Sequence, residues 1–255
     1  MNELVSIIMP SYNSAKYISE AIESVIAQTY TNWELLITDD CSTDNSRDII
    51  KQYAETDSRV KLFCLNENSG AGVARNNSIK EAKGRFIAFL DSDDRWMPNK
   101  LEVQIKFMLD NGYELTYSSY DVCNQSGDIV SKVTCLNRLS YKTLIRDNGI
   151  GCLTAIYDTK NIGKIYMPTI RKRQDWGLWL SIIKKTKFAY GIKDKYLAIY
   201  RDSNGLSSSK IKLLKANFNL YNKVEKYNKL TSFILLVFYF LPYYFYKKFK
   251  QKIGC

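Results

Sequence analysis

Two acidic clusters in the sequence could bind a metal ion together with a phosphorylated substrate. Asp39 and Asp40 follow the apolar run at residues 34–38, and DSDD at residues 91–94 follows the apolar run at 86–90. Several carboxylates at one place repel one another unless a cation or hydrogen-bond donors compensate. Mg²⁺ and Mn²⁺ prefer oxygen ligands and commonly link one or two carboxylates to substrate phosphates. The D-x-D of the second cluster therefore predicts a site for Mn²⁺ or Mg²⁺ and a diphosphate.

A structural role is the alternative for the first cluster. Aspartate is favoured in turns and at helix N termini, and Cys41-Ser42-Thr43 directly follows Asp39-Asp40. From the residues alone, either aspartate could serve the turn or face a ligand.

A third acid, Asp175, has the setting of a general base. The chain contains no histidine, so a base that works near neutral pH must come mainly from Asp or Glu. Asp175 follows the basic run at 171–173, which would hold it ionised, and precedes Trp176, which could form a platform for a sugar. The alternative role is an N-cap of the helix expected at 176–185, because Asp is common there.

The elements that would position these acids alternate between short apolar runs and segments of helical period. This alternation predicts a largely parallel sheet covered by helices on both faces. Ligands of such sheets bind beyond the carboxyl ends of the strands, so both acidic clusters would face one crevice. We expect strands at residues 5–9, 34–38, 60–65, 86–90 and 115–122, and helices at 16–28, 44–56, 72–82 and 99–109.

After residue 125 the alternation is less regular. The pattern there predicts helices at 141–147, 176–185 and 210–227, and short strands at 188–191 and 197–200.

The last apolar segment, residues 230–246, leads directly into the basic run KKFKQK. Its length is at the lower limit for a membrane-spanning helix, and Pro242 interrupts it. Tyrosines near a basic end favour the level of the lipid headgroups. We therefore expect a helix that lies on a membrane surface or is partly inserted, with a core helix packed on the sheet as the alternative.

The composition limits the classes of function. The chain has 255 residues, 45% of them hydrophobic, and a net charge of +11, which suits an α/β domain that attracts polyanions. The six cysteines form no C-x-x-C pair and the N terminus has no signal-peptide pattern, which indicates a reducing compartment. Nucleic acid is not an expected partner, because the C-terminal lysines gather beside an apolar helix.

Four segments together resemble the motifs of a known family. They are VSIIMPSYN at 5–13, ITDDCSTDNS at 37–46, NSGAGVARNNSI at 68–79 and GRFIAFLDSDDRWMPNKL at 84–101. Their order and spacing resemble inverting family 2 glycosyltransferases, and RKRQDWGLWLSI at 171–182 resembles the segment that supplies the catalytic base of that family. The resemblance implies a GT-A-like (Rossmann-like) α/β fold, with a mostly parallel central sheet flanked by helices.

On the donor side, the resemblance assigns a nucleotide-binding role to four residues. Pro10, Tyr12 and Asp40 would line the uracil or equivalent base, with Asp40 accepting a hydrogen bond from it. Arg75 would lie close to the nucleotide.

The resemblance also assigns the metal, the base and the acceptor side. Asp91 and Asp93 would form the D-x-D pair, with Asp93 in direct contact with Mn²⁺ or Mg²⁺ and Asp91 nearer the ribose and the metal. Asp175 would be the general base. Trp176 and Trp179 would shape the acceptor side.

Two positions depart from the pattern of the family. Gln174 stands where the family often has Glu before the catalytic Asp, and Gly177 replaces an acidic residue often found two positions after it. Both departures concern the acceptor pocket rather than the base itself.

The implied activity is transfer of a sugar from a nucleotide-sugar, most simply a UDP-sugar, to a polyprenyl-diphosphate-linked saccharide in O-antigen, capsule or related polysaccharide synthesis. The enzyme would act as a peripheral protein at the cytoplasmic face of the bacterial inner membrane. Residues 1–205 would form the transferase domain, with a nucleotide-sugar half at 1–125 and an acceptor half at 126–205, and 206–255 the membrane-association segment. A phosphoryl-receiver-like or nucleotide-binding regulatory module without transferase activity is the alternative.

Overall fold

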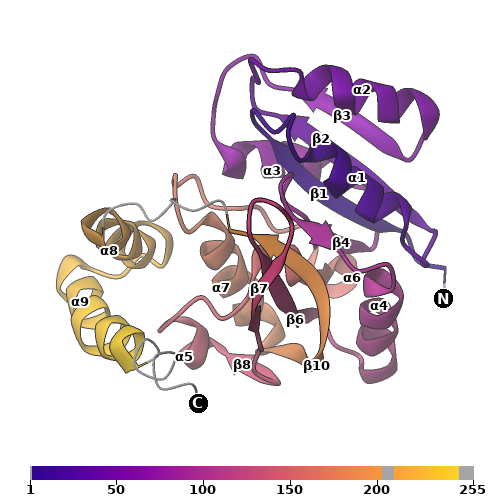
Figure 1. The fold of residues 1–255 in the computed structure, drawn as a ribbon. Coiled ribbons are helices and arrows are strands. Elements are labelled where there is room, and N and C mark those ends of the chain that lie inside the picture. The colour runs from indigo at the N-terminus through magenta and orange to yellow at the C-terminus, as the bar shows by residue number, and fades with distance from the viewer. Residues whose placement is uncertain (1, 203–209, 247–255) are drawn as a thin grey trace.

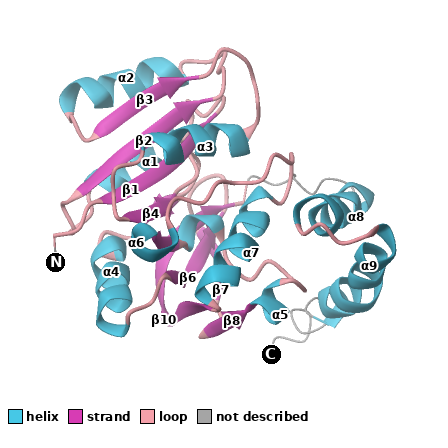
Figure 2. Cartoon of the chain, turned by 180° about the vertical axis from the view of Figure 1, so that it is seen from behind, coloured by secondary structure: helices cyan, strands magenta, loops and turns pink. Residues whose placement is uncertain are grey.

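A mixed β-sheet runs through the computed structural model, which describes residues 2–202 and 210–246 (Figure 1). Within that part of the chain the sheet has ten strands, in the order β3-β2-β1-β4-β9-β6-β10-β5, with β7 added beside β6 and β8 beside β10. Helices flank the sheet, and the region from α8 to α9 lies at the end of the molecule far from β3 (Figure 2).

The first half is a parallel α/β unit. Strand β1 pairs in parallel with β2 and with β4, and β2 pairs in parallel with β3. Each element that the sequence predicts before residue 124 is confirmed, with ends within two residues of the expected ones. These elements are β1 (Val5–Ser11), α1 (Ile18–Ile26), β2 (Trp33–Asp39), α2 (Ser46–Thr56), β3 (Val60–Cys64), α3 (Ala71–Glu81), β4 (Phe86–Phe89), α4 (Lys100–Asn111) and β6 (Leu115–Cys123).

The second half makes the sheet mixed rather than largely parallel. Strand β9 (Ile156–Asp158) lies between β4 and β6 and is antiparallel to both. With only three residues, β9 has no periodic pattern that the sequence could have revealed. The other strands are β7 (Ile129–Val133), β8 (Arg138–Ser140), β10 (Phe188–Arg201) and β5 (Arg95–Trp96), which precedes α4 in the chain but pairs with β10.

Strand β10 corrects the expectation of two short strands at 188–191 and 197–200. It is one strand of 14 residues that pairs in parallel with β6. The register shifts between Ile192 and Tyr196 and again before Ile199. The polar and exposed residues Lys193, Asp194 and Lys195 lie in the shifted region and interrupt the apolar pattern. A continuous strand therefore looked like two separate strands in the sequence.

The helices of the second half are mostly short. The helix expected at 141–147 is limited to α5, the one at 176–185 is confirmed as α7, and the one at 210–227 consists of α8 and the π-helical turn η2. They are α5 (Tyr141–Leu144), the 3₁₀ turn η1 (Cys152–Thr154), α6 (Thr159–Ile162), α7 (Gln174–Thr186), α8 (Lys210–Asn219), η2 (Leu220–Val224), α9 (Lys229–Ile234) and the π-helical η3 (Leu235–Phe240).

Side chains that alternate along β1 build a hydrophobic core on each face of the sheet. Ile7 and Met9 belong to one cluster together with α1 and α4 residues, whereas Ile8 belongs to the other, which α7 covers. Successive residues of a strand point to opposite faces, so each inner strand contributes to both cores. The sheet is thereby fixed between two packed layers, and its strand ends have defined positions.

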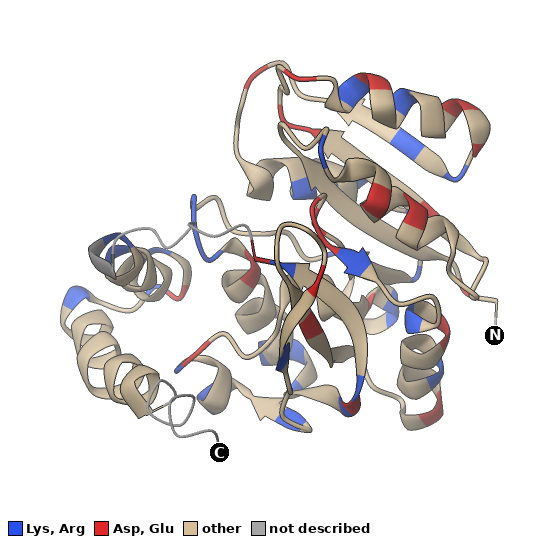
Figure 3. Cartoon of the chain, viewed as in Figure 1, with Lys and Arg blue, Asp and Glu red and all other residues tan. Residues whose placement is uncertain are grey.

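The C-terminal segment forms one helix over Lys229–Tyr246 that is long and apolar enough to cross a membrane by length and composition. Only 17% of these residues are buried. Phe240 packs into the core at 6.4 Å from Trp176, while Phe233 and Phe245 are exposed. Figure 3 shows that the helix from α9 onwards carries almost no charged side chains. The basic run at 247–252 and the expected boundary at 205/206 lie outside the described residues.

Candidate active site

The acidic clusters meet at one edge of the sheet, as the parallel pairing of the first strands requires. Ser11 of β1 pairs with Asp39 of β2, and Ile8 of β1 pairs with Phe89 of β4, two residues before Asp91. Figure 3 shows acidic residues in the loops that leave both β2 and β4. The loops after β1, β2 and β4 therefore face a common crevice.

Asp39 serves the structure of this crevice rather than a ligand. Its side chain is fully buried, forms an ion pair with Arg47, and accepts hydrogen bonds from the backbone and the hydroxyl of Ser42. Cys41, two residues later, has φ 65°, which a turn with this geometry requires. The turn role that the sequence left open for either aspartate thus belongs to Asp39.

Asp40 holds the loop before α3. Its Oδ1 accepts the backbone N–H of Ser69 and its Oδ2 that of Gly70, each at 2.7 Å. Gly70 has φ 92°, a conformation that favours glycine. A carboxylate has further acceptor sites beyond these bonds, so Asp40 can still accept a bond from a nucleotide base. Of the other expected base-binding residues, Pro10 is buried at the end of β1 and Tyr12 is 51% exposed beside it.

Arg75 of α3 and Asp91 form a partly buried ion pair in the crevice. The side chain of Arg75 is 9% exposed and that of Asp91 is 29% exposed. Burial alone would lower the pKa of Arg75, but the carboxylates of Asp91 and Asp175 and the nearby Cys152 raise it above its usual value. Arg75 is therefore a permanent cation between the D-x-D and Asp175, where it can neutralise a phosphate.

Asp93 and Asp94 are the acids of the cluster whose negative charges are disfavoured by their surroundings. Burial, and then the neighbouring carboxylate of Asp91, raise the pKa of Asp93 to about 6. Asp94 is 1% exposed, and burial together with the Asp91 and Asp93 carboxylates raises its pKa well above the usual range. Such crowding favours binding of a cation or a proton.

Arg201, at the end of β10, fixes the backbone of this acidic loop. Its Nε donates to the carbonyl of Asp93 at 3.0 Å, and its backbone N–H donates to Asp94 at 2.9 Å. Its guanidinium also forms an ion pair with Glu20 of α1 and lies 4.2 Å above the ring of Tyr17. The loop that carries the D-x-D is therefore tied to both α1 and β10.

The donor set fits a divalent metal only in part. Asp91 and Asp93 offer carboxylate oxygens, which Mg²⁺ and Mn²⁺ prefer. Among the described residues there is no group of three or more His, Cys, Asp and Glu residues with the arrangement of a metal site. The two carboxylates of Asp91 and Asp93 are the ligand set expected for a metal that takes its remaining ligands from substrate phosphates and water.

Asp175 lies in the first turn of α7 and faces a cavity. It does not cap the helix, because the N-cap residue is Arg173, with φ 67°. Its Oδ2 accepts a hydrogen bond from Asn148 Nδ2 at 2.7 Å. The N terminus of α7 stabilises a negative charge at this position, and the hydrogen bond from Asn148 orients the carboxylate.

The cavity beside Asp175 has a volume of about 520 Å³ and is lined by β6, β10 and the loop at 147–151. Tyr120 and Tyr200 form part of its wall. The pKa of Tyr200 is raised to about 12, first by burial and then by the carboxylates of Asp94 and Asp93. Tyr200 therefore stands between the acidic loop and the cavity, which has the size of a small-molecule site.

The two tryptophans expected on the acceptor side are part of the core. Trp176 and Trp179 are both fully buried. Trp176 donates its indole N–H to the carbonyl of Leu144 at 2.7 Å, and the ring of Trp179 packs edge-on against Phe89 at 5.3 Å. Trp176 is thus no sugar platform in this structure. Both rings have an indirect role, because they fix α7 and with it Asp175.

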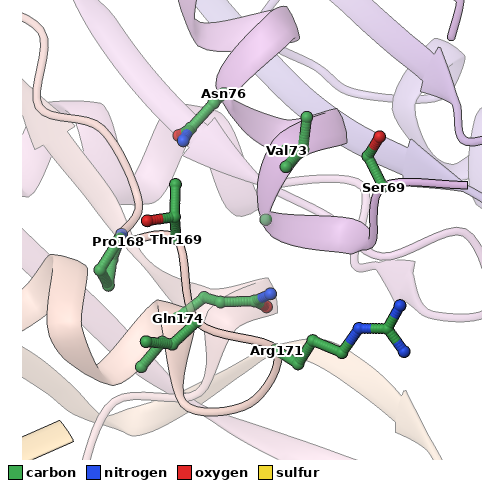
Figure 4. Close-up of a pocket in the computed structure, with 9 residues that line it drawn as sticks. Ser69, Val73, Asn76, Pro168, Thr169, Arg171 and Gln174 are labelled. Carbon is green, nitrogen blue, oxygen red and sulfur yellow. The ribbon is translucent and has the colours of Figure 1, made fainter. Parts of the chain in front are cut away.

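The two departures from the family pattern have structural explanations. Gln174 reaches across to α3, where a Cβ atom at Gly72 would lie 2.8 Å from its Nε2, and both residues line a small cavity with Val73 and Pro168 (Figure 4). A Cβ atom at Gly177 would lie 2.6 Å from Cγ of Pro168. Gly177 is therefore required by close packing of α7, not by the acceptor.

The sequence did not single out Asn148, Arg201, Tyr200 or Tyr243 as site residues. Asn148 orients Asp175, Arg201 holds the acidic loop, and Tyr200 and Tyr243 line the cavity. The only signal for Tyr200 and Arg201 is their place at the end of the strand expected at 197–200. Asn148 and Tyr243 come from segments far from the motifs, which the fold brings to the site.

The sequence and the fold both match known proteins. The profile of the family described as Glycosyl transferase family 2 matches residues 6–163. The chain is 43% identical over 225 residues, 88% of its length and 89% of the relative, to TuaG of Bacillus subtilis (strain 168), a glycosyltransferase ascribed to teichuronic acid biosynthesis. It is 44% identical over 218 residues, 85% of each chain, to the UDP-Glc:alpha-D-GlcNAc-diphosphoundecaprenol beta-1,3-glucosyltransferase WfgD of Escherichia coli.

A solved structure has the same fold. Residues 1–349 of S. aureus TarS in complex with UDP superpose with a TM-score of 0.68 and 22% identity, over 92% of this chain and 70% of the other.

Proposed function

The chain belongs to glycosyl transferase family 2, and we propose that it transfers a sugar from a UDP-sugar to a polyprenyl-diphosphate-linked saccharide with inversion at the anomeric carbon. The observation that carries the proposal is the cavity that has Asp175 in one wall and Tyr200, next to the acidic loop, in another. Such a cavity can hold an acceptor hydroxyl between a base and a nucleotide-sugar.

On the donor side, the proposal gives each residue of the crevice a role. Asp40 accepts a hydrogen bond from the base, with Pro10 and Tyr12 against its ring. Arg75 neutralises phosphate charge, and its ion pair with Asp91 holds the guanidinium in the crevice for this role. The two backbone amides on Asp40 keep the carboxylate fixed before the nucleotide arrives, which lowers the entropy lost on binding.

We further propose that Asp93 and Asp91 hold Mn²⁺ or Mg²⁺ together with the diphosphate. The metal would stabilise the charge that develops on the leaving diphosphate. The raised pKa of Asp93 supports this role, since burial and then the Asp91 carboxylate disfavour its negative charge, and a bound cation would compensate that charge.

The transfer step needs one base. The oxygen of the acceptor hydroxyl attacks the anomeric carbon while the bond from that carbon to the diphosphate breaks, and UDP leaves with the bonding electrons. Asp175 takes the hydroxyl proton. A single displacement inverts the anomeric centre, so no protein nucleophile is required. The hydrogen bond from Asn148 supports this assignment because it fixes the carboxylate.

The acceptor class and the location rest on the relatives and on the C-terminal helix. WfgD is named for an acceptor with a diphosphoundecaprenol group, and such a substrate resides in a membrane. The exposed apolar side chains of the helix Lys229–Tyr246 would hold the enzyme as a peripheral protein at the cytoplasmic face. Family membership disfavours the alternative of a regulatory module without transferase activity.

A donor screen tests the proposal. Purified protein is incubated with a panel of UDP-sugars and α-D-GlcNAc-diphosphoundecaprenol, with Mn²⁺ or with EDTA, and UDP release is measured. The proposal predicts metal-dependent UDP release and product formation with at least one donor. Absence of turnover with every donor, although the protein is folded and metal is present, would overturn the proposal.

A further inference from the structure

The helix Lys229–Tyr246 carries a group of tyrosines apart from the side chains that pack on the core, and two of them, Tyr239 and Tyr246, are exposed. Phe240 and Tyr244 pack against the core, and Phe233 and Phe245 point outwards. Tyr239, Tyr243 and Tyr246 are spaced at four and three residues and so share another face. These three tyrosines line a cavity of about 340 Å³ together with Arg146, Phe238 and Pro242.

This aromatic cavity adjoins the cavity of Asp175. Tyr243 lines both of them. The C-terminal helix is therefore a wall of the candidate active site as well as a candidate membrane contact. A path leads from Asp175, past Tyr243, to Arg146 and the aromatic residues. Helix α5, which Arg146 follows closely, lies beside the C-terminal end of this helix in both views (Figures 1 and 2).

Arg146 has the features of an anion-binding residue. Its guanidinium lies 5.5 Å from the centre of the Tyr239 ring. Its Nε is buried without a hydrogen-bond partner, and no carboxylate forms an ion pair with it in the described part of the chain. A buried donor without a partner costs free energy that an incoming acceptor would recover. The planar fork of an arginine fits phosphate oxygens.

We propose that the cavity of Arg146 binds the diphosphate and the first isoprenoid unit of the acceptor, an inference that rests on the proposed function. The acceptor has the order sugar, diphosphate, lipid, and the path has the order Asp175, Arg146, aromatic side chains. Arg146 binds the diphosphate, and Tyr239 and Tyr243 contact the isoprenoid. The acidic residue next to it, Asp147, lines the cavity of Asp175 instead, on the sugar side.

Binding of farnesyl diphosphate, a soluble diphosphate with an isoprenoid chain, tests this site without knowledge of the sugars. Its affinity is measured by calorimetry in the presence of UDP and Mn²⁺, which occupy the donor site. We expect Arg146→Gln to weaken farnesyl diphosphate binding about tenfold to hundredfold, as for a lost charge-assisted hydrogen bond. Arg146→Lys should lose less affinity for farnesyl diphosphate than Arg146→Gln does, because lysine keeps the positive charge.

Two controls make the outcome specific. Farnesol has no diphosphate, so Arg146→Gln should leave farnesol binding unchanged. Tyr243→Ala should weaken the binding of both farnesol and farnesyl diphosphate. Arg138→Gln removes a charge from β8, where the guanidinium lies against Phe188, outside both cavities; it should change nothing. Equal binding to wild type and Arg146→Gln, or no binding to wild type, would overturn the inference.

The same variants separate this inference from the proposed function. If Arg146→Gln transfers sugar to the lipid-linked acceptor with wild-type kcat/KM, the inference fails while the proposed function stands. If wild type binds farnesyl diphosphate through Arg146 but transfers sugar from no UDP-sugar, the proposed function fails and the binding site stands.

Discussion

At the scale of single residues, some charges of the site are compensated by neighbours and others are not. Arg75 compensates Asp91, and Arg201 holds the backbone of the acidic loop, but Asp93 is crowded by burial and by Asp91. An ionised carboxylate in such a position lowers the stability of the fold, and it is a good ligand for a cation. The metal proposal rests on this unfavourable negative charge of Asp93, which a bound cation would compensate.

The pKa of Asp93 predicts how stability depends on pH. In the folded, metal-free protein its pKa is about 6, above the value of 3.8 for an exposed Asp, so the folded state binds the proton more tightly. Its contribution is present below about pH 4 and is lost as pH rises through 6. At pH 7.5 we expect Asp93→Asn to raise the free energy of unfolding by about 1–3 kcal/mol, with no difference at pH 4.

Urea unfolding of the metal-free protein at both pH values measures this difference. Mn²⁺ with UDP should then reverse the order, because wild type gains stability from bound ligand and Asp93→Asn does not. A variant that is less stable than metal-free wild type at pH 7.5 would contradict the assignment.

At the scale of elements, α7 carries Asp175, the proposed base, and the close packing of the helix sets the position of this residue. Trp176 and Trp179 anchor the helix in the core, and Gly177 allows Pro168 to approach it. The helix itself was predictable from its apolar period. The need for Gly177 was not, because the contact joins residues of different segments and appears only when the chain is folded.

A pair of glycine variants tests the role of this contact. We expect Gly177→Ala to destabilise the protein by about 1–3 kcal/mol, because its Cβ would meet the rigid ring of Pro168. Gly72→Ala is the matched control in α3, where the Cβ would meet the flexible end of Gln174, so it should be neutral or stabilising. Thermal unfolding compares the two; equal stabilities would show that close packing at Gly177 is not needed.

At the scale of the whole molecule, the sequence predicted the parallel half well and the second half less well. The motifs lie at the ends of regular strands, so Asp40, Asp91 and Asp93 were placed at one edge of the sheet from the alternation alone. The wall of the cavity comes from β10, the loop at 147–151 and the C-terminal helix. Those segments are irregular or distant in the chain, and tertiary packing alone brings them together.

The exposed face of the C-terminal helix predicts association with membranes. Phe233 and Phe245 are 55% and 64% exposed, and transfer of such a side chain from water into lipid gains about 1.5–3 kcal/mol. We therefore expect Phe233→Ser and Phe245→Ser each to weaken binding to phosphatidylglycerol vesicles about tenfold. Sedimentation with vesicles measures the bound fraction.

The matched control is Ile129, which lies on β7 and not on the C-terminal helix. Ile129 is 48% exposed and also apolar, so Ile129→Ser should leave vesicle binding unchanged. If the three variants bind vesicles as wild type does, the helix is not the membrane contact.

Asp175→Asn tests the central claim, that Asp175 takes the proton of the acceptor hydroxyl, most directly. Transfer is measured in a single turnover with Mn²⁺ and a lipid-linked acceptor, and donor binding is measured separately. The account predicts that the variant binds the UDP-sugar as wild type does but transfers the sugar about 10²–10⁴ times more slowly, the usual contribution of a general base. Transfer at the wild-type rate by a variant that has lost the carboxylate would contradict it.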